Sequence, residues 1–154
     1  MAADDGTVLK LRAEDADDLA VLSACLQDAF VAVRDLAYMP QERSFVFVAN
    51  RFRWERAARR ALGEPGYERI LCAVTFDEVA GVSYRGFRRS EDERILLLLA
   101  IRPEAGTTGG TIDLEFSGAA VIRLEIGRIL CRARDFGEPW PTRWQPRHDP
   151  AECG

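Results

Sequence analysis

Apolar residues near the start of the chain recur at helical spacing. Leu19, Leu22, Leu26 and Ala29 fall at positions i, i+3, i+7 and i+10, which places them along one face of a helix. Acidic residues at 14, 15, 17 and 18 come just before this stripe, where the partial positive charge of a helix N-terminus favours carboxylates. The pattern predicts a helix over about residues 15–28.

The apolar spacing elsewhere is mostly two, which is typical of strands with one buried face. It predicts strands over 8–11, 31–36, 45–49, 70–76, 79–87, 95–101, 111–116 and 121–126. We expect hairpins within 30–49, 70–87 and 111–126, and 95–101 is apolar on both faces, so it should be central and covered on each side. The strand–turn–strand units 30–49 and 79–101 fit either a duplication or generic hairpins.

The C-terminal part of the chain shows two further patterns. Ile126, Ile129, Leu130 and Ala133 have helical spacing, and Gly137 is a typical stop, so a short closing helix is predicted. Residues 139–148 are too rich in proline for a helix or a central strand. We interpret them as an extended tail that docks through two tryptophans, Trp140 and Trp144.

Together these elements predict one α+β domain spanning 1–154, with disordered ends at 1–7 and 149–154. The expected architecture is an antiparallel, strongly bent sheet or partly open barrel with an N-terminal helix and a short C-terminal helix. A pleckstrin-homology-like barrel is the best analogue. A fold analogy of this kind carries no function with it.

Charge and composition narrow the function classes. The formal net charge is −4, so no overall positive field draws the chain to nucleic acid or to an anionic membrane surface. The 21 basic residues include a single lysine, Lys10, and the single histidine, His148, lies in the proline-rich tail. Because histidine and lysine supply much of the acid–base and nucleophilic chemistry near neutral pH, this scarcity argues against catalysis.

The cysteines and the N-terminus suggest a compartment. Cys25, Cys72, Cys131 and Cys153 lie far apart, with no paired spacing typical of zinc sites, and the first three stand in apolar surroundings typical of small buried side chains. The first ten residues lack the apolar stretch of a signal peptide. We therefore expect a reduced, cytoplasmic protein with no metal, no cofactor and no catalytic residue that the sequence identifies.

The densest candidate site follows the strand over 45–49. Guanidinium groups beside an aromatic ring can hold phosphates or carboxylates, which makes this cluster a candidate surface for a protein or small anionic partner. The alternative is structural: a strand with Phe52 and Trp54 on one face and Arg51 and Arg53 on the other, one face buried and one wet. A helix containing a Glu55–Arg59 pair would follow it. The residues of the cluster are Arg51, Arg53, Trp54, Arg56, Arg59 and Arg60.

Three stretches of the chain resemble a known bacterial family. They are residues 19–29 with the motif Gln27-Asp28-Ala29, residues 44–55 with Asn50 to Glu55, and residues 116–125. They resemble the mainly alphaproteobacterial domain of unknown function 2948, and the likeness extends from Leu9 to about His148. The resemblance implies a single-domain cytoplasmic bacterial protein, and it brings no activity, cofactor or catalytic residue with it.

Two functions remain open from the sequence. The first is a non-catalytic binding or assembly protein that contacts a protein or small anionic partner through the arginine and aromatic surface. The second is a small-molecule binding protein or enzyme, in which arginine and aspartate line a pocket for an anionic metabolite. Self-association through an exposed sheet edge is compatible with both.

Overall fold

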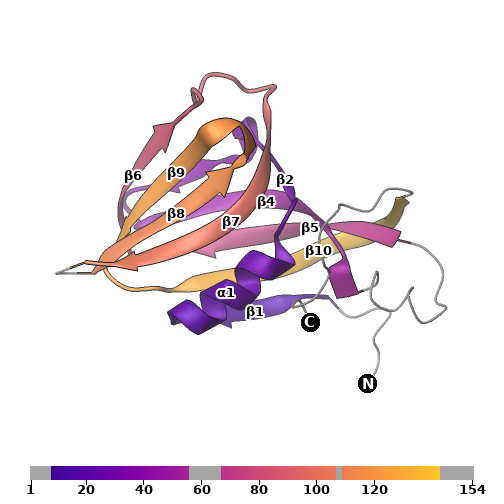
Figure 1. The fold of residues 1–154 in the computed structure, drawn as a ribbon, viewed down its shortest axis with the longest axis horizontal. Coiled ribbons are helices and arrows are strands. Elements are labelled where there is room, and N and C mark those ends of the chain that lie inside the picture. The colour runs from indigo at the N-terminus through magenta and orange to yellow at the C-terminus, as the bar shows by residue number, and fades with distance from the viewer. Residues whose placement is uncertain (1–7, 56–66, 107–108, 143–154) are drawn as a thin grey trace.

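The computed structural model of the protein describes residues 8–55, 67–106 and 109–142. Its main feature is a single antiparallel sheet of ten strands accompanied by one α-helix (Figure 1). The strands are β1 (Lys10–Ala13), β2 (Phe30–Ala32), β3 (Ala37–Met39), β4 (Ser44–Phe52), β5 (Tyr67–Phe76), β6 (Val79–Arg85), β7 (Ile95–Ala105), β8 (Gly110–Phe116), β9 (Ala120–Ile126) and β10 (Cys131–Thr142).

The predicted helix forms as α1 (Ala16–Cys25), directly after β1. The Asp15 side chain accepts a hydrogen bond from the Asp18 backbone N–H at 2.8 Å, which caps the first turn. Leu19, Leu22 and Leu26 are fully buried in the main core, so the apolar stripe identifies the buried face correctly. The helix packs against β1 and β7 (Figure 1).

The sheet is open, and the prediction of a partly open barrel of pleckstrin-homology type is wrong. The strand order is β1-β10-β5-β4-β2-β7-β8-β9-β6, with β3 pairing to β4 beside this path. β1 and β6 stand at opposite ends of the order, and each pairs with one neighbour only. Because these two edges do not pair with each other, the sheet is not closed. It is also not strongly curled, so the predicted strong bend is wrong, whereas the predicted antiparallel pairing is confirmed.

The predicted closing helix is also wrong, since residues 131–142 form the longest strand of the described sheet. Ile126 belongs to β9, and Cys131, Ala133 and Asp135 alternate with exposed neighbours along β10. The helical spacing arose by joining the end of one strand to the start of the next. The first four residues of the expected extended tail, 139–142, continue β10 and pair with β5, so Trp140 lies opposite Arg69.

Two of the three expected hairpins form. β2 pairs with β4, and β8 pairs with β9. The hairpin expected within 70–87 does not form, because the Asp77 N–H donates to the Leu130 carbonyl and the Gly127 N–H donates to the Glu78 carbonyl. These bonds direct the chain away from β5, and β6 pairs with β9 instead. The second strand–turn–strand unit therefore does not repeat the first.

The core is built from residues of nearly every strand together with α1, and it forms one main cluster. Cys72 and Cys131 are buried within it as free thiols, as expected of small apolar side chains. Cys25 is buried in a smaller cluster with Phe52 and Trp54, but it is disulfide-bonded, so the expectation of a small apolar thiol in a reduced protein is wrong for Cys25. β7 is central, as predicted, but it is not covered on both faces: Ile95 is 55% exposed and Leu99 is 41% exposed. Within the described ranges, no helix is long and apolar enough to cross a membrane.

Candidate functional site

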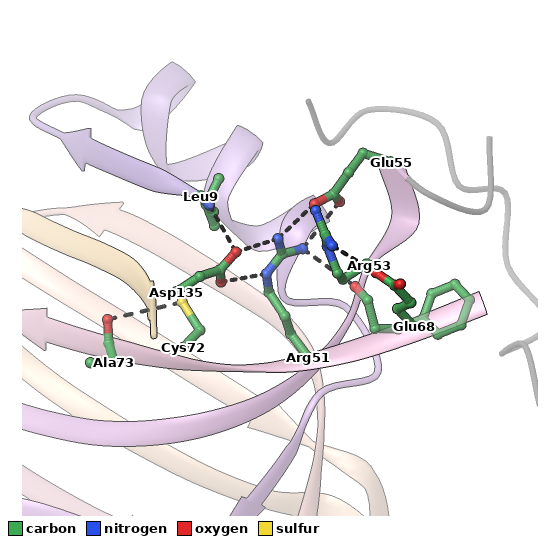
Figure 2. Close-up of polar contacts among 9 residues, drawn as sticks. Leu9, Arg51, Arg53, Glu55, Glu68, Cys72, Ala73 and Asp135 are labelled. Atoms are coloured by element: carbon green, nitrogen blue, oxygen red, sulfur yellow. Dashed lines mark hydrogen bonds and ion pairs between the residues drawn. The ribbon is translucent and has the colours of Figure 1, made fainter. Parts of the chain in front are cut away.

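Arg51, at the end of β4, is at the centre of a buried ionic network (Figure 2). Its Nε and Nη2 donate to the two carboxylate oxygens of Asp135 on β10, at 2.8 and 2.7 Å, and neither side chain is exposed to solvent. Its Nη1 and Nη2 also donate to Glu55, at 3.2 and 2.8 Å. Paired charges of this kind tolerate burial because each lost contact with water is replaced by a hydrogen bond.

The network also holds β1 beside β10. The Leu9 N–H donates to the Asp135 carboxylate at 2.8 Å, and the Asp135 N–H donates to the Leu9 carbonyl at 2.9 Å. Figure 2 shows Asp135 lying between Leu9 and Arg51. The pairing of Leu9 with Asp135 fixes the register of the edge strand, so Lys10 lies directly opposite Arg134.

Burial and pairing act in opposite directions on the ionisation of this network. Desolvation lowers the pKa of Arg51, but the hydrogen bonds and charges of Asp135 and Glu55 outweigh it and raise that pKa above its ordinary value. Desolvation likewise raises the pKa of Glu55, but the hydrogen bond and charge of Arg51, a backbone hydrogen bond and the charge of Arg53 together outweigh it and leave the pKa below its ordinary value of 4.5. Both groups are therefore held in their charged forms.

Two neighbouring arginines, Arg53 and Arg69, are also buried and bind other residues of the same chain. Arg53 is 2% exposed, and its Nη1 donates to Glu68 at 2.7 Å. Arg69 is 4% exposed, donates to the Asn50 carbonyl at 2.9 Å, and lies 4.5 Å from the centre of the Phe30 ring. Burial lowers the pKa of Arg69, and the charge of Asp28 offsets part of that effect.

The residues predicted to form the arginine and aromatic surface thus lie in different places. Arg51, Arg53 and Trp54 are buried, and the Trp54 Nε1–H donates to the Gln27 carbonyl at 3.2 Å. The wet face that the structural alternative expected on one side of residues 51–54 is wrong, and Glu55 pairs with Arg51. The remaining residues of that cluster, Arg56, Arg59 and Arg60, lie outside the described residues, as does the pairing expected for Glu55 and Arg59.

Of the two tryptophans predicted to dock the C-terminal tail, the structure describes only one. Trp140 is 36% exposed and lies on β10, next to β5. Trp144 lies outside the described residues. The convergence of arginine and aspartate foreseen for a metabolite pocket does occur, at Arg51 and Asp135, but their polar atoms are engaged with each other, with Glu55 and with the backbone.

The exposed face of β1 and β10 carries a basic cluster that the sequence reasoning missed. Four cations from these two strands surround an open groove of about 480 Å³, whose floor is formed by small side chains of β5, Ala73 and Thr75. We call this surface the basic face. Its cations are Lys10, Arg12, Arg132 and Arg134, and all four are exposed.

On the basic face, each cation of β1 lies directly opposite a cation of β10. Lys10 lies opposite Arg134, and Arg12 lies opposite Arg132. The backbone bond between Leu9 and Asp135 makes the adjacent Lys10–Arg134 pair a non-hydrogen-bonded pair, the type in which facing side chains are closest. Like charges in such positions destabilise a sheet.

Acidic neighbours neutralise half of this charge. Arg12 pairs with Glu14, and Arg132 donates to Asp77 at 3.0 Å. Lys10 and Arg134 have no carboxylate partner within the described part of the chain. The best-defined free positive charge of the face is therefore the directly opposed pair Lys10 and Arg134, above the open groove.

A periodic signal for this face was present in the sequence. Lys10 and Arg12 alternate with apolar residues, and so do Arg132 and Arg134. The second pair was hidden because its segment was interpreted as helical, which would have pointed the two side chains in different directions. Among the described residues, no three His, Cys, Asp or Glu side chains gather in a way that could hold a metal ion.

The fold and site define an open antiparallel sheet protein with one helix, a buried ionic network and a basic outer face. The model of the family described as protein of unknown function (DUF2948) matches residues 9–148. The chain belongs to this family. No curated protein and no solved structure matches the chain.

Proposed function

We propose that this protein is a non-catalytic binding protein that holds an anionic partner on its basic face. The proposal keeps the function expected from the sequence and moves it to other residues, because Arg51 and Arg53 are buried and already paired. The observation that carries it is the Lys10–Arg134 pair, two exposed like charges placed directly opposite each other.

The Lys10–Arg134 pair is electrostatically unfavourable in the absence of an anion. Two facing cations repel each other, and a bound anion converts this repulsion into attraction with both of them. The chain as a whole carries more acidic than basic residues, with a net charge of −4, so an overall excess of basic residues does not explain the cations of the basic face. The groove floor of Ala73 and Thr75 leaves space for an anionic group to approach between the two long side chains.

The test is retention on a carboxymethyl cation-exchange column at neutral pH and low salt. A protein with a net charge of −4 is retained on such a column only through a local basic surface. We expect the wild type to elute later than the double variant Lys10→Glu/Arg134→Glu.

A matched control separates the local surface from overall charge. Arg85 on β6 and Arg88 just after it are also exposed, and Arg85→Glu/Arg88→Glu changes the net charge by the same amount at the opposite end of the strand order from β1. The control should elute later than Lys10→Glu/Arg134→Glu. Equal retention of the two variants would overturn the proposal, provided that circular dichroism shows both to be folded.

A further inference from the structure

Among the described strands, β1 leaves one edge unpaired, and this edge lies directly beside the basic face. β1 pairs with β10 on one side and ends the strand order on the other. The Leu9 carbonyl accepts from the Asp135 N–H and the Leu9 N–H donates to the Asp135 carboxylate, so both groups of Leu9 face β10. Alternation therefore turns the N–H and C=O groups of Lys10 and Arg12 toward the other edge of β1. The residues that present their charges on the outer face thus also present their backbone to an incoming strand.

The same face continues into an apolar row. Extending the register of β1 and β10 by two residues places Val8 opposite Phe136, and these side chains are 43% and 42% exposed. Phe136 in turn lies opposite Leu71 of β5. Reading along the edge, the outer face therefore presents an apolar position, then Lys10, then Arg12 at a spacing of two residues.

We propose that the anionic partner is an extended acidic segment of another protein, which adds to the β1 edge as a strand. Its alternate side chains would be apolar beside Val8 and acidic beside Lys10 and Arg12. This inference rests on the proposed function and adds the class of partner and the way it binds. Main-chain hydrogen bonds supply affinity in strand addition, and alternate side chains supply specificity.

Charge complementarity selects this occupant over a second copy of the chain. Pairing β1 with β1 of another copy would bring Lys10 and Arg12 close to the same two cations, and facing like charges disfavour that arrangement. Acidic residues after β1 limit where along the strand the partner's acidic side chains can lie. Glu14 follows β1 directly, so an acidic side chain of the partner is favoured beside Lys10 and disfavoured past Ala13.

A protective role is the main alternative explanation. Short edge strands with lysine or arginine prevent unwanted sheet extension in many proteins. Protection explains Lys10 and Arg12, but it gives no reason for Arg132 and Arg134 to face them from the neighbouring strand. A site for acidic side chains accounts for the cations of both strands.

The test uses a fluorescent peptide of the pattern Val-Thr-Asp-Thr-Asp-Thr-Val, which reads the same in both directions. Its binding to the full chain is followed by fluorescence polarisation at low salt. Two further versions carry N-methyl groups, one on the two aspartates and the other on the three threonines. Only one alternating set of amides faces β1 in an added strand, so we expect one version to bind about tenfold or more weakly and the other to bind like the parent.

The outcomes separate this inference from the proposed function. Equal binding of the two methylated peptides, or no peptide binding while the basic face still retains the protein on the carboxymethyl column, would overturn strand addition and leave the proposed function standing. Failure of both the peptide and the column experiment would overturn both. As a variant control, Lys10→Glu should abolish peptide binding, whereas Arg85→Glu should not.

Discussion

The Arg51–Asp135 pair offers a quantitative test of the buried network. Replacing Asp135 by asparagine keeps the size of the side chain and removes its charge. Breaking a buried ion pair by altering one partner costs about 3–5 kcal/mol. Because Glu55 still contacts Arg51, we expect a loss near the lower end, about 3 kcal/mol in the free energy of unfolding.

The assay is urea unfolding followed by circular dichroism, together with calorimetry for the melting temperature. For a chain of 154 residues, a loss of about 3 kcal/mol corresponds to a fall of roughly 6–12 °C. The single variant Arg51→Met should fall by a similar amount, since it leaves the Asp135 carboxylate buried without its cationic partner.

A double-mutant cycle with the single variants Arg51→Met and Asp135→Leu identifies the cause. In Arg51→Met/Asp135→Leu both charges are absent, so no unpaired charge stays buried at these two positions, and we expect the double variant to be more stable than either single variant. As a control, Arg123→Gln, which removes an exposed partner of Asp113, should change the melting temperature little. The reasoning is refuted if the double variant loses the sum of the two single effects.

Three further predictions concern acid stability, thiol reactivity and charge repulsion. The pKa of Glu55 lies below its ordinary value of 4.5, so its ionised form stabilises the fold above that value, and this stabilisation is lost as the pH falls through the lowered pKa. The wild type should therefore lose more melting temperature than Glu55→Gln between about pH 6 and pH 3, and parallel losses would contradict this. Burial raises the pKa of Cys72 to about 12 and also raises the pKa of Cys131, so mass spectrometry should find neither thiol alkylated by iodoacetamide in the native protein at about pH 8, and rapid native labelling would count against the structure. Arg134→Gln removes a like charge facing Lys10 and should raise the free energy of unfolding by a few tenths of a kcal/mol while shortening column retention; a destabilised variant would show that the pair is not repulsive.

Local pattern predicted the elements more reliably than their pairing. The spacing of Leu19, Leu22 and Leu26 identified α1 and its buried face, because three leucines at helical spacing have no comparable strand interpretation. Alternation located most strands. It did not show that β6 pairs with β9, because that choice depends on long-range backbone bonds from Asp77 and Glu78.

The two main errors have a common physical cause, which is the burial of charged residues. Asp135 occupies a buried position of β10, so the period of two there did not appear as an apolar pattern and the segment was interpreted as a helix. Arg51 and Arg53 were placed at the surface because arginine is rarely buried without a partner. Their partners Asp135 and Glu68 lie far away in the sequence, and no local pattern connects them.

The candidate site was obscured for a related reason. Each half of the basic face shows clear alternation, but only the register of β1 with β10 brings Lys10 opposite Arg134. That register depends on the contact between Leu9 and the buried Asp135. The buried network therefore determines the arrangement of the exposed site.

The most direct test of the central claim is an NMR titration of ¹⁵N-labelled full-length protein with tripolyphosphate at low salt. If the basic face binds anions, the largest amide shift changes should fall on β1, β10 and the groove floor, at Lys10, Ala73, Thr75 and Arg134, and should disappear in Lys10→Glu/Arg134→Glu. Absence of shift changes at these residues, or unchanged shifts in that variant, would contradict the account.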